Sequence, residues 1–311
     1  MMRVESVEVG EPGTGQCRVR HTAIGVNYVD TYHRSGLYSL PALPSDLGME
    51  AAGVVEAVGP DVTELAPGQR VGYATAGPGA YSEARLVPAA QLIALPDDIA
   101  DEVAAAVLLK GMTAEYLIRR TLPVRRGQTV LFHAAAGGVG LIACQWLAHL
   151  EVTVIGTVGS DAKAELARSR GCAHCIVYTR EDFPTRVQEI TEGKGVPVVY
   201  DSVGRATFEG SLDCLATRGT LVSFGNASGP PPPFEAGLLG QKGSLYLTRP
   251  SLFHYVGTRA ELVESANAVF DVVRGGAVQV EIGQRWPLAD ASAAHTALES
   301  RATVGASILL P

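Results

Sequence analysis

The sequence predicts an α/β protein in which a doubly wound parallel sheet is inserted into a β-rich domain. From residue 129 onward, short apolar runs alternate with segments of helical periodicity, which is typical of parallel strands joined by crossover helices. Residues 129–146 read as a buried strand, a glycine-rich turn and the start of an apolar helix. The first hundred residues instead carry short β-rich runs separated by glycine and proline, as in an antiparallel barrel or sandwich.

The elements follow from these patterns in chain order. In the first domain we expect strands at 17–24, 52–58, 70–74, 84–87 and 92–94, and then a helix-rich joining segment at 99–120. The inserted sheet is predicted to use strands at 129–133, 153–156, 175–178, 197–201, 220–225 and 244–248. Its helices are predicted at 139–149, 161–169, 183–192 and 207–217, with a short turn around 233–239.

The tail is expected to return to the first domain. It carries predicted helices at 259–274 and 288–300 and a last strand at 306–310, which the parallel sheet does not need. The predicted domains are therefore 1–111 with 254–311, and 112–253. A length of 311 residues also favours two domains, because single cores rarely grow beyond about 250–300 residues.

Composition and charge exclude several classes of protein. The chain is 47% hydrophobic and 18% charged, which is globular, and its formal charge of −7 without a run of Lys and Arg gives no footprint for nucleic acid or an anionic membrane. No apolar stretch is long enough for a membrane span or resembles a signal peptide, so we expect a cytoplasmic protein.

The five cysteines predict neither disulfides nor a metal site. They cannot all pair, which suits a reducing compartment. Cys172 and Cys175 have the spacing of half a zinc or redox site, but no second pair would complete four ligands. We expect these cysteines to pack as small apolar residues.

The glycine-rich turn predicts a dinucleotide site. It reads Ala135-x-Gly137-x-x-Gly140, a fingerprint whose first glycine is replaced by alanine. Gly137 and Gly138 leave backbone N–H groups accessible to a pyrophosphate at a helix N-terminus, and Gly140 allows the helix to pack closely on its strand.

The second strand favours NADPH over NADH. An NAD-selective site has an acidic residue about 20 residues past the glycine turn, where it binds the ribose 2′-hydroxyl. Here the strand leads through Gly156 to Ser160 and Lys163, which suit a 2′-phosphate. Asp161 is close in sequence, but we expect it to support the helix N-terminus. Tyr178 is expected either to pack on the adenosine ribose or to sit at the rim of the core.

With these features in place, the sequence resembles the zinc-free quinone oxidoreductases, the zeta-crystallin branch of the medium-chain dehydrogenase/reductase superfamily. The resemblance covers nearly the whole chain and rests on seven segments: 23–32, 35–38, 109–113, 132–140, 200–204, 222–226 and 299–302. It implies a GroES-like catalytic domain formed by both chain ends and an inserted Rossmann domain that binds NADPH. It also implies a homodimer, for which 244–248 is the expected edge strand.

The resemblance also implies the site residues. Asn27 and Tyr32 are expected at the nicotinamide pocket and Thr113 at the hinge helix, while Arg301 reaches the cofactor from the C-terminal segment. The remaining cofactor contacts are expected at Ala135, Gly137, Gly138 and Val139 for the pyrophosphate, Gly156, Ser160, Lys163 and Tyr178 for the adenosine end, and Phe224, Gly225 and Asn226 for the nicotinamide end. The catalytic candidate is Tyr38, whose alternative is to form the wall of the pocket.

Zinc chemistry is not expected from this sequence. Zinc-dependent relatives carry a catalytic Cys near the position of Val26 and Asn27 and a His where this chain has Met49, before Glu50. Without a Lewis acid the substrate must accept hydride readily, so we expect a small planar quinone or an activated alkene. The alternatives are an NADPH-dependent enone or enoyl reductase and, from another class, an NADPH-binding structural or RNA-binding protein.

Two further expectations concern the histidines and the first strand. No nucleophile elbow or triad order accompanies the seven histidines, His133 included, so hydrolase chemistry is not expected. Family members usually begin with a further strand before the equivalent of Arg3. Its absence predicts either a misassigned start or an exposed edge in the first domain.

Overall fold

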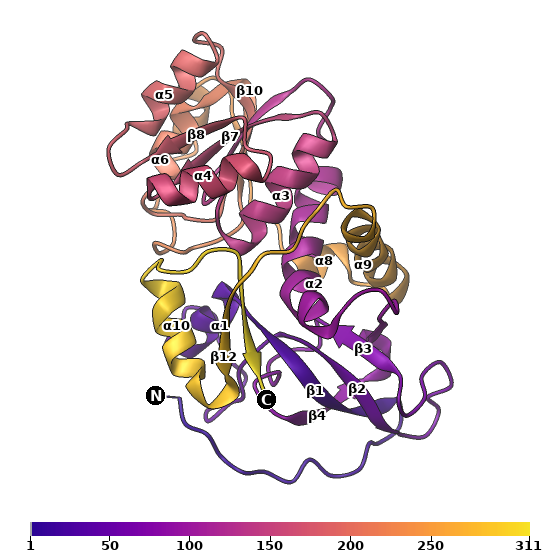
Figure 1. Cartoon of the computed structure of the whole chain (residues 1–311). Helices are drawn as coiled ribbons and strands as arrows, with labels where there is room; N and C mark the ends of the chain where they lie inside the picture. The colour runs from indigo at the N-terminus through magenta and orange to yellow at the C-terminus, as the bar shows by residue number, and fades with distance from the viewer. Residues whose placement is uncertain (1) are drawn as a thin grey trace. The chain divides into compact units, whose positions relative to one another are not determined.

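The computed structural model describes residues 2–311 and divides into two compact units. Unit 1 contains the described residues up to Met112 together with Val256–Gly275 and Val280–Pro311, and unit 2 contains Thr113–Tyr255 and Gly276–Gln279. Both chain ends therefore fold with the β-rich unit, and the parallel sheet is inserted between them, as the sequence predicted (Figure 1).

Over residues 2–311, seven strands form the sheet of unit 1, in the order β12-β13-β1-β2-β3-β5 with β4 also paired to β1. The C-terminal strand pairs antiparallel with β1, where Ile24 lies opposite Leu309. The strands are β1 (Gln16–Val26), β2 (Glu50–Val58), β3 (Arg70–Tyr73), β4 (Ala84–Pro88), β5 (Ile93–Ala94), β12 (Ile282–Pro287) and β13 (Ala306–Leu310).

Strand β12 was missing from the sequence prediction. It is the edge strand of the sheet, it alternates half-buried and exposed residues, and it contains Gly283 and Pro287. A short edge strand of this kind carries a weak apolar pattern and was therefore missed.

The core of unit 1 includes Ile24, Tyr73 and Leu92, and Ala294 of the last helix belongs to it. The helices and turns of unit 1 are α1 (Tyr28–Ser35), the 3₁₀ turn η1 (Ala89–Gln91), α2 (Asp101–Glu115), whose last residues enter unit 2, α9 (Arg259–Arg274), the 3₁₀ turn η3 (Leu288–Asp290) and α10 (Ala291–Glu299). The prediction missed α1, and the helix predicted at 288–300 is divided into η3 and α10. In contrast, α9 has its predicted bounds because Thr258 and Glu261 form a reciprocal capping box at its N-terminus.

The sheet of unit 2 is parallel throughout, with the order β11-β10-β9-β6-β7-β8. This is the strand order of a dinucleotide-binding fold, in which the carboxyl ends of the strands form the binding edge. The strands are β6 (Thr129–Phe132), β7 (Thr153–Val158), β8 (His174–Val177), β9 (Val196–Asp201), β10 (Leu215–Ser223) and β11 (Tyr246–Thr248).

The helices of unit 2 follow most of the predicted segments. They are the π-helical turn η2 (Tyr116–Thr121), α3 (Gly138–His149), α4 (Asp161–Ser169), α5 (Phe183–Ile190), α6 (Phe208–Asp213), α7 (Gly237–Gln241) and α8 (Leu252–Tyr255). The helix predicted at 207–217 is too long, because β10 already begins at Leu215, which lies beside Val196 of β9. Among residues 2–311, no helix combines the length and apolar character needed to span a membrane.

Candidate functional site

The turn between β6 and α3 has the structure expected of a phosphate-binding loop. Its N-cap, Gly137, provides no side-chain cap, so the first N–H groups of α3, those of Gly138, Val139 and Gly140, lack an intrahelical acceptor. The N–H of Gly137 closes the turn onto the carbonyl of Ala134 at 2.9 Å. A Cβ on Gly140 would lie 2.3 Å from that carbonyl oxygen, which explains the glycine. These residues fit a pyrophosphate held by backbone N–H groups.

Two of the predicted cofactor-binding residues, Ala135 and Gly156, pack where this turn meets β7. Ala135 is fully buried, and its N–H donates to the carbonyl of Thr157 at 3.1 Å. Gly156 lies between Ala135 and Cys172: a Cβ there would be 2.7 Å from the Ala135 methyl and 2.5 Å from the Cys172 sulfur. Both residues therefore hold the turn against β7.

A buried polar network joins the carboxyl ends of three strands beside the turn. The ring of His133 lies 2.8 Å from the hydroxyl of Thr157 and 3.0 Å from that of Ser211, and Ser211 donates to Asp201 at 3.0 Å. Because Ser211 uses its proton on Asp201, the His133 Nε2 carries a hydrogen and Nδ1 accepts from Thr157. Burial lowers the pKa of His133. The serine, histidine and aspartate are buried, so the network orders the strand ends.

The residues predicted for the 2′-phosphate gather at the start of α4. Ser160 caps this helix by accepting from the Lys163 N–H at 3.3 Å, and a Cβ on Gly159 would lie 2.9 Å from the Tyr178 hydroxyl. The ring of Tyr178 thus lies over the loop that leads to Ser160. It is 39% exposed, which places it at the rim rather than in the core.

Arg180, which was not predicted, also lies in this region. Its guanidinium donates to both carboxylate oxygens of Asp161, at 2.6 and 2.5 Å. The hydrogen bonds from Arg180 lower the pKa of Asp161, so this acid stays ionised and paired. No spacing rule links these two residues, because Arg180 follows the next strand.

The residues predicted for the nicotinamide end follow β10. Phe224 is half-buried against Phe132, with ring centroids 5.9 Å apart, and Gly225 approaches Ser202 so closely that a Cβ would lie 2.4 Å from its carbonyl oxygen. The side-chain oxygen of Asn226 accepts a hydrogen bond from the Arg249 guanidinium at 3.1 Å. Arg249 also donates to the carbonyl of Ser223 at 2.8 Å and was not predicted.

In unit 1, Asn27 precedes α1 and is held by Glu50. Its side-chain amide donates to the Glu50 carboxylate at 2.9 Å, and Lys110 donates to the same oxygen at 3.0 Å. All three residues are buried, with exposed fractions of 5% or less. Glu50 and Lys110 were not among the predicted site residues, because a buried ion pair has no sequence signature.

A second buried network lies at the N-terminus of α1. Asp30 accepts from the Asn27 N–H at 2.8 Å and from the Tyr81 hydroxyl at 3.0 Å, and Tyr81 lies 2.9 Å from His295 Nε2. Arg34 lies 3.4 Å from Nδ1 of the same ring and can only donate, so Nε2 carries the hydrogen. Burial raises the pKa of Asp30 to about 7 and lowers that of His295 to about 4. Asp30 is therefore mostly protonated below about pH 7 and mostly ionised above it.

The two tyrosines of the predicted site pack on each other. Tyr32 is 8% exposed, and its ring meets the half-buried ring of Tyr38 edge-on at 5.1 Å. The Tyr38 N–H donates to the carbonyl of Tyr32 at 3.1 Å, which fixes the loop that carries it.

The remaining predictions fall on separate elements. Thr113 is buried on α2 in unit 2, whereas Arg301 is exposed in unit 1, in the left-handed conformation at φ 59°. Val26 and Met49 are core residues, each 2% exposed. Within 2–311, no three or more His, Cys, Asp or Glu side chains are grouped as metal ligands.

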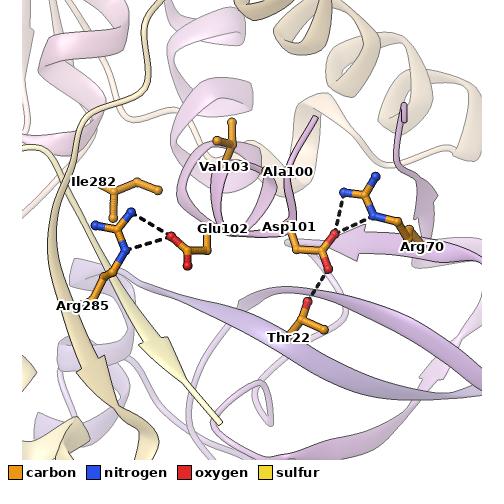
Figure 2. Close-up of a pocket in the computed structure, with 8 residues that line it drawn as sticks. All are labelled: Thr22, Arg70, Ala100, Asp101, Glu102, Val103, Ile282 and Arg285. Atoms are coloured by element: carbon orange, nitrogen blue, oxygen red, sulfur yellow. Dashed lines mark hydrogen bonds and ion pairs between the residues drawn. The ribbon is translucent and has the colours of Figure 1, made fainter. Parts of the chain in front are cut away.

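The hollow on unit 1 shown in Figure 2 does not coincide with any of these residues. Its volume is about 520 Å³, and two ion pairs line it, Arg70 with Asp101 and Arg285 with Glu102. Figure 2 shows each arginine pointing toward its own acidic partner. Because its charged groups already satisfy each other, it offers little to a ligand.

Two family models and several relatives match the chain. The alcohol dehydrogenase GroES-like domain matches residues 13–97, and the zinc-binding dehydrogenase model matches residues 138–273. The quinone oxidoreductase of Pseudomonas aeruginosa is 53% identical over 311 residues, which covers 100% of this chain and 96% of that protein. The 2-haloacrylate reductase of a Burkholderia species is 49% identical over 313 residues, covering 99% and 94%.

A solved structure agrees over the same length. The crystal structure of Escherichia coli quinone oxidoreductase complexed with NADPH matches with a TM-score of 0.97 at 50% identity, covering 99% of this chain and 95% of that one. The fold and the family expected from the sequence are thus confirmed. This chain belongs to the quinone oxidoreductase family of the medium-chain dehydrogenase/reductase superfamily.

Proposed function

We propose that this chain is an NADPH-dependent quinone oxidoreductase that works without a metal. The observation that carries the proposal is the full-length similarity to quinone oxidoreductases, including one solved with NADPH. The binding edge of unit 2 supports it, because the uncapped N-terminus of α3 suits a pyrophosphate and the start of α4 suits a 2′-phosphate.

NADPH, when bound, supplies the hydride that reduces the quinone. The chain's own residues would hold it at the following places. The backbone N–H groups of Gly138 and Val139 bind the pyrophosphate, and Ser160, Lys163 and Tyr178 bind the 2′-phosphate. The nicotinamide end is bound by Phe224, Gly225 and Asn226, and the further contacts are Asn27, Tyr32, Thr113 and Arg301. Ala135, Gly137 and Gly156 shape the turn. Tyr38 is the proposed proton donor to the reduced acceptor.

A turnover assay tests the activity. Purified protein is mixed with NADPH and a naphthoquinone, and NADPH absorbance is followed over time. Oxidation of NADPH that depends on both protein and quinone is expected. Binding of NADPH without turnover of any quinone tried would contradict the assignment.

Lysine substitution tests the cofactor preference. Lys163→Ala is expected to raise the KM for NADPH about tenfold more than the KM for NADH, because a charge-assisted hydrogen bond to the 2′-phosphate is lost. Lys194→Ala, an exposed lysine of the same unit, serves as the control. Equal effects of Lys163→Ala on both cofactors would overturn the 2′-phosphate assignment.

A second candidate is the reduction of activated alkenes. The relative at 49% identity is named a 2-haloacrylate reductase, and hydride transfer to an alkene conjugated with a carbonyl needs the same geometry as transfer to a quinone. Comparing kcat/KM for a naphthoquinone, an enone and a 2-haloacrylate separates the two. A value at least about tenfold higher for either alkene would favour this candidate.

We also propose that the functional domains are 1–111 with 254–311 and 112–253, and that the protein acts in the cytoplasm.

We further propose that two copies of the chain associate through β11. This strand ends the sheet and exposes 61% of Tyr246, so it offers an edge for pairing. Light scattering on the wild type tests the dimer: a mass twice that of one chain is expected, and the mass of a single chain would overturn this part of the proposal.

A further inference from the structure

Asp201 ends β9 at the carboxyl edge of the unit 2 sheet and is 1% exposed. Burying a carboxyl group is unfavourable unless hydrogen bonds replace those that it makes with water. Its Oδ1 accepts from the N–H of Val203 at 2.7 Å and from that of Gly204 at 3.0 Å. Its Oδ2 accepts from the hydroxyl of Thr207 at 2.7 Å and from that of Ser211 at 3.0 Å. Both oxygens are fully used, so the group is held in one position.

The Oδ1 contacts set the turn that follows β9, residues 202–206. Two successive N–H groups, those of Val203 and Gly204, converge on one oxygen, as in a turn that an aspartate side chain stabilises. Gly204 is in the left-handed region at φ 87°, and a Cβ there would lie 2.4 Å from the carbonyl oxygen of Gly229. The Asp201 side chain thus fixes the path of this turn, and Gly204 lets the turn run against a second segment.

The second segment, residues 224–229, is hydrogen-bonded to this turn by backbone and side chain. Four backbone N–H groups take part: that of Ala227 donates to the carbonyl of Ser202, that of Ser228 to the carbonyl of Val203, that of Arg205 to the carbonyl of Gly229 and that of Ala206 to the Ser228 hydroxyl. The Ser228 hydroxyl donates in turn to the Val203 carbonyl at 2.8 Å. A displaced turn would therefore displace the segment.

The first three residues of this segment are the ones expected at the nicotinamide end. Phe224 donates its N–H to the backbone carbonyl of Asp201 at 2.8 Å. A Cβ on Gly225 would lie 2.4 Å from a carbonyl oxygen of the turn, and one on Gly204 would lie 3.4 Å from the Cα of Asn226. The three residues thus lie directly against the turn that Asp201 holds.

We propose that Asp201 is a positioning residue: its Oδ1 holds the turn 202–206 and, through this turn, the segment 224–226 at the nicotinamide end of the site. This rests on the proposed function, in which that segment contacts the nicotinamide end of NADPH. The adenosine end is expected at residues that follow β7 and β8, so it does not depend on this turn. Loss of the carboxyl group should therefore weaken the part of NADPH binding that comes from the nicotinamide.

A pair of ligands measures that part. NADPH is compared with 2′-phospho-ADP-ribose, which lacks only the nicotinamide, by fluorescence titration for NADPH and by competition for the second ligand. Wild-type protein is expected to bind NADPH at least about tenfold more tightly, the difference that one hydrogen bond of about 1.4 kcal/mol makes. The ratio of the two dissociation constants cancels any loss that both ligands share.

Variants then assign the ratio to Asp201. Asp201→Ala leaves the N–H groups of the turn without their acceptor and is expected to lower the ratio about tenfold, toward one. Asp201→Asn keeps a side-chain oxygen for the same N–H groups and is expected to stay within about threefold of the wild-type ratio. The matched control is Ser211→Ala, which removes the link from Oδ2 to His133 but keeps the Oδ1 contacts, and which is expected to keep the ratio.

Three results would overturn the inference. They are an unchanged ratio in folded Asp201→Ala, equal losses in Asp201→Ala and Asp201→Asn, and a loss in Ser211→Ala as large as that in Asp201→Ala. If Asp201→Ala does not fold, Ser228→Ala decides, because it cuts the side-chain contacts between the turn and the segment at a half-buried position. It is expected to lower the ratio about threefold, and an unchanged ratio overturns the inference.

The wild-type measurements separate this inference from the proposed function. A wild-type ratio near one, with quinone-dependent NADPH oxidation intact, overturns the inference alone. Failure of wild-type protein to bind NADPH overturns the proposed function first.

Discussion

The guanidinium of Arg180 donates hydrogen bonds to both carboxylate oxygens of Asp161 at the N-terminus of α4. Asp161 follows Ser160 directly, so an unpaired carboxylate there would repel a 2′-phosphate. The ion pair cancels that charge while the aspartate still supports the helix N-terminus. A sequence with an acid close to the proposed phosphate site can therefore remain selective for NADPH.

Removing this arginine should weaken NADPH binding selectively. Arg180→Ala leaves Asp161 ionised and unpaired beside the 2′-phosphate, so we expect NADPH affinity to fall about three- to tenfold, with screening by water limiting the loss at this exposed position. NADH affinity should stay unchanged. Adding Asp161→Asn to Arg180→Ala removes the repulsion and should restore part of the NADPH affinity. Equal losses for NADPH and NADH would contradict this account.

The sequence determined the fold wherever local signals were strong. The segment 161–169 was predicted at its observed bounds because Ser160 caps α4, and 259–274 because of the box formed by Thr258 and Glu261. Residues 215–217 were predicted as the end of a helix, because the strand pairing that begins β10, Leu215 with Val196, joins residues distant in sequence. Tertiary pairing decides such positions.

The candidate site was predicted in outline but not in its supporting contacts. The glycine turn and the residues of α4 could be read from spacing, since backbone geometry demands particular residues there. Glu50, Lys110 and Arg180 could not be found in this way. Their roles depend on partners that lie up to 60 positions away in the chain, and only folding brings those partners within hydrogen-bond distance.

Asp30 should make stability depend on pH. Its pKa is about 7 in the folded protein because of burial, above its ordinary value of 3.8, and Tyr81, Glu50 and Lys110 are the groups that act on it. The folded state therefore binds this proton more strongly than the unfolded state does. Protonation of Asp30 adds to the free energy of unfolding in full below about pH 4, and this contribution is lost as pH rises through about 7. The loss is on the order of 4 kcal/mol for a fully buried carboxyl.

Asp30→Asn isolates this effect from the buried histidines. The low pKa of His295, about 4, acts in the opposite direction, because stability is lost as pH falls below about 6.5. We expect the Tm difference, wild type minus Asp30→Asn, to decrease between about pH 5 and pH 8. Asp46→Asn, which changes an exposed carboxyl of the same unit, should show no such trend. A difference that is flat across this range would show that Asp30 is ionised throughout.

Loss of the His133 ring should destabilise unit 2. His133→Ala removes hydrogen bonds to Thr157 and Ser211 and the edge-on packing against Phe183, whose ring centroid lies 5.0 Å away. Together these losses should cost about 2–4 kcal/mol in the free energy of unfolding. His174→Ala, at an exposed position of β8, should change it by less than about 0.5 kcal/mol. Denaturant titration of both variants tests the difference, and similar values would show that the network is dispensable.

The hydroxyl of Tyr38 should matter for turnover rather than for binding. Its ring packs edge-on against Tyr32 at 5.1 Å, so Tyr38→Phe keeps the aromatic contact and removes only the oxygen. A positioned general acid contributes about 10²- to 10⁴-fold, and we therefore expect kcat with a naphthoquinone to fall by at least about tenfold. The Kd for NADPH should be unchanged, and Tyr246→Phe, at an exposed position of β11, should keep full activity. If Tyr38→Phe retains kcat, the ring of Tyr38 forms the wall of the pocket and the proton comes from water.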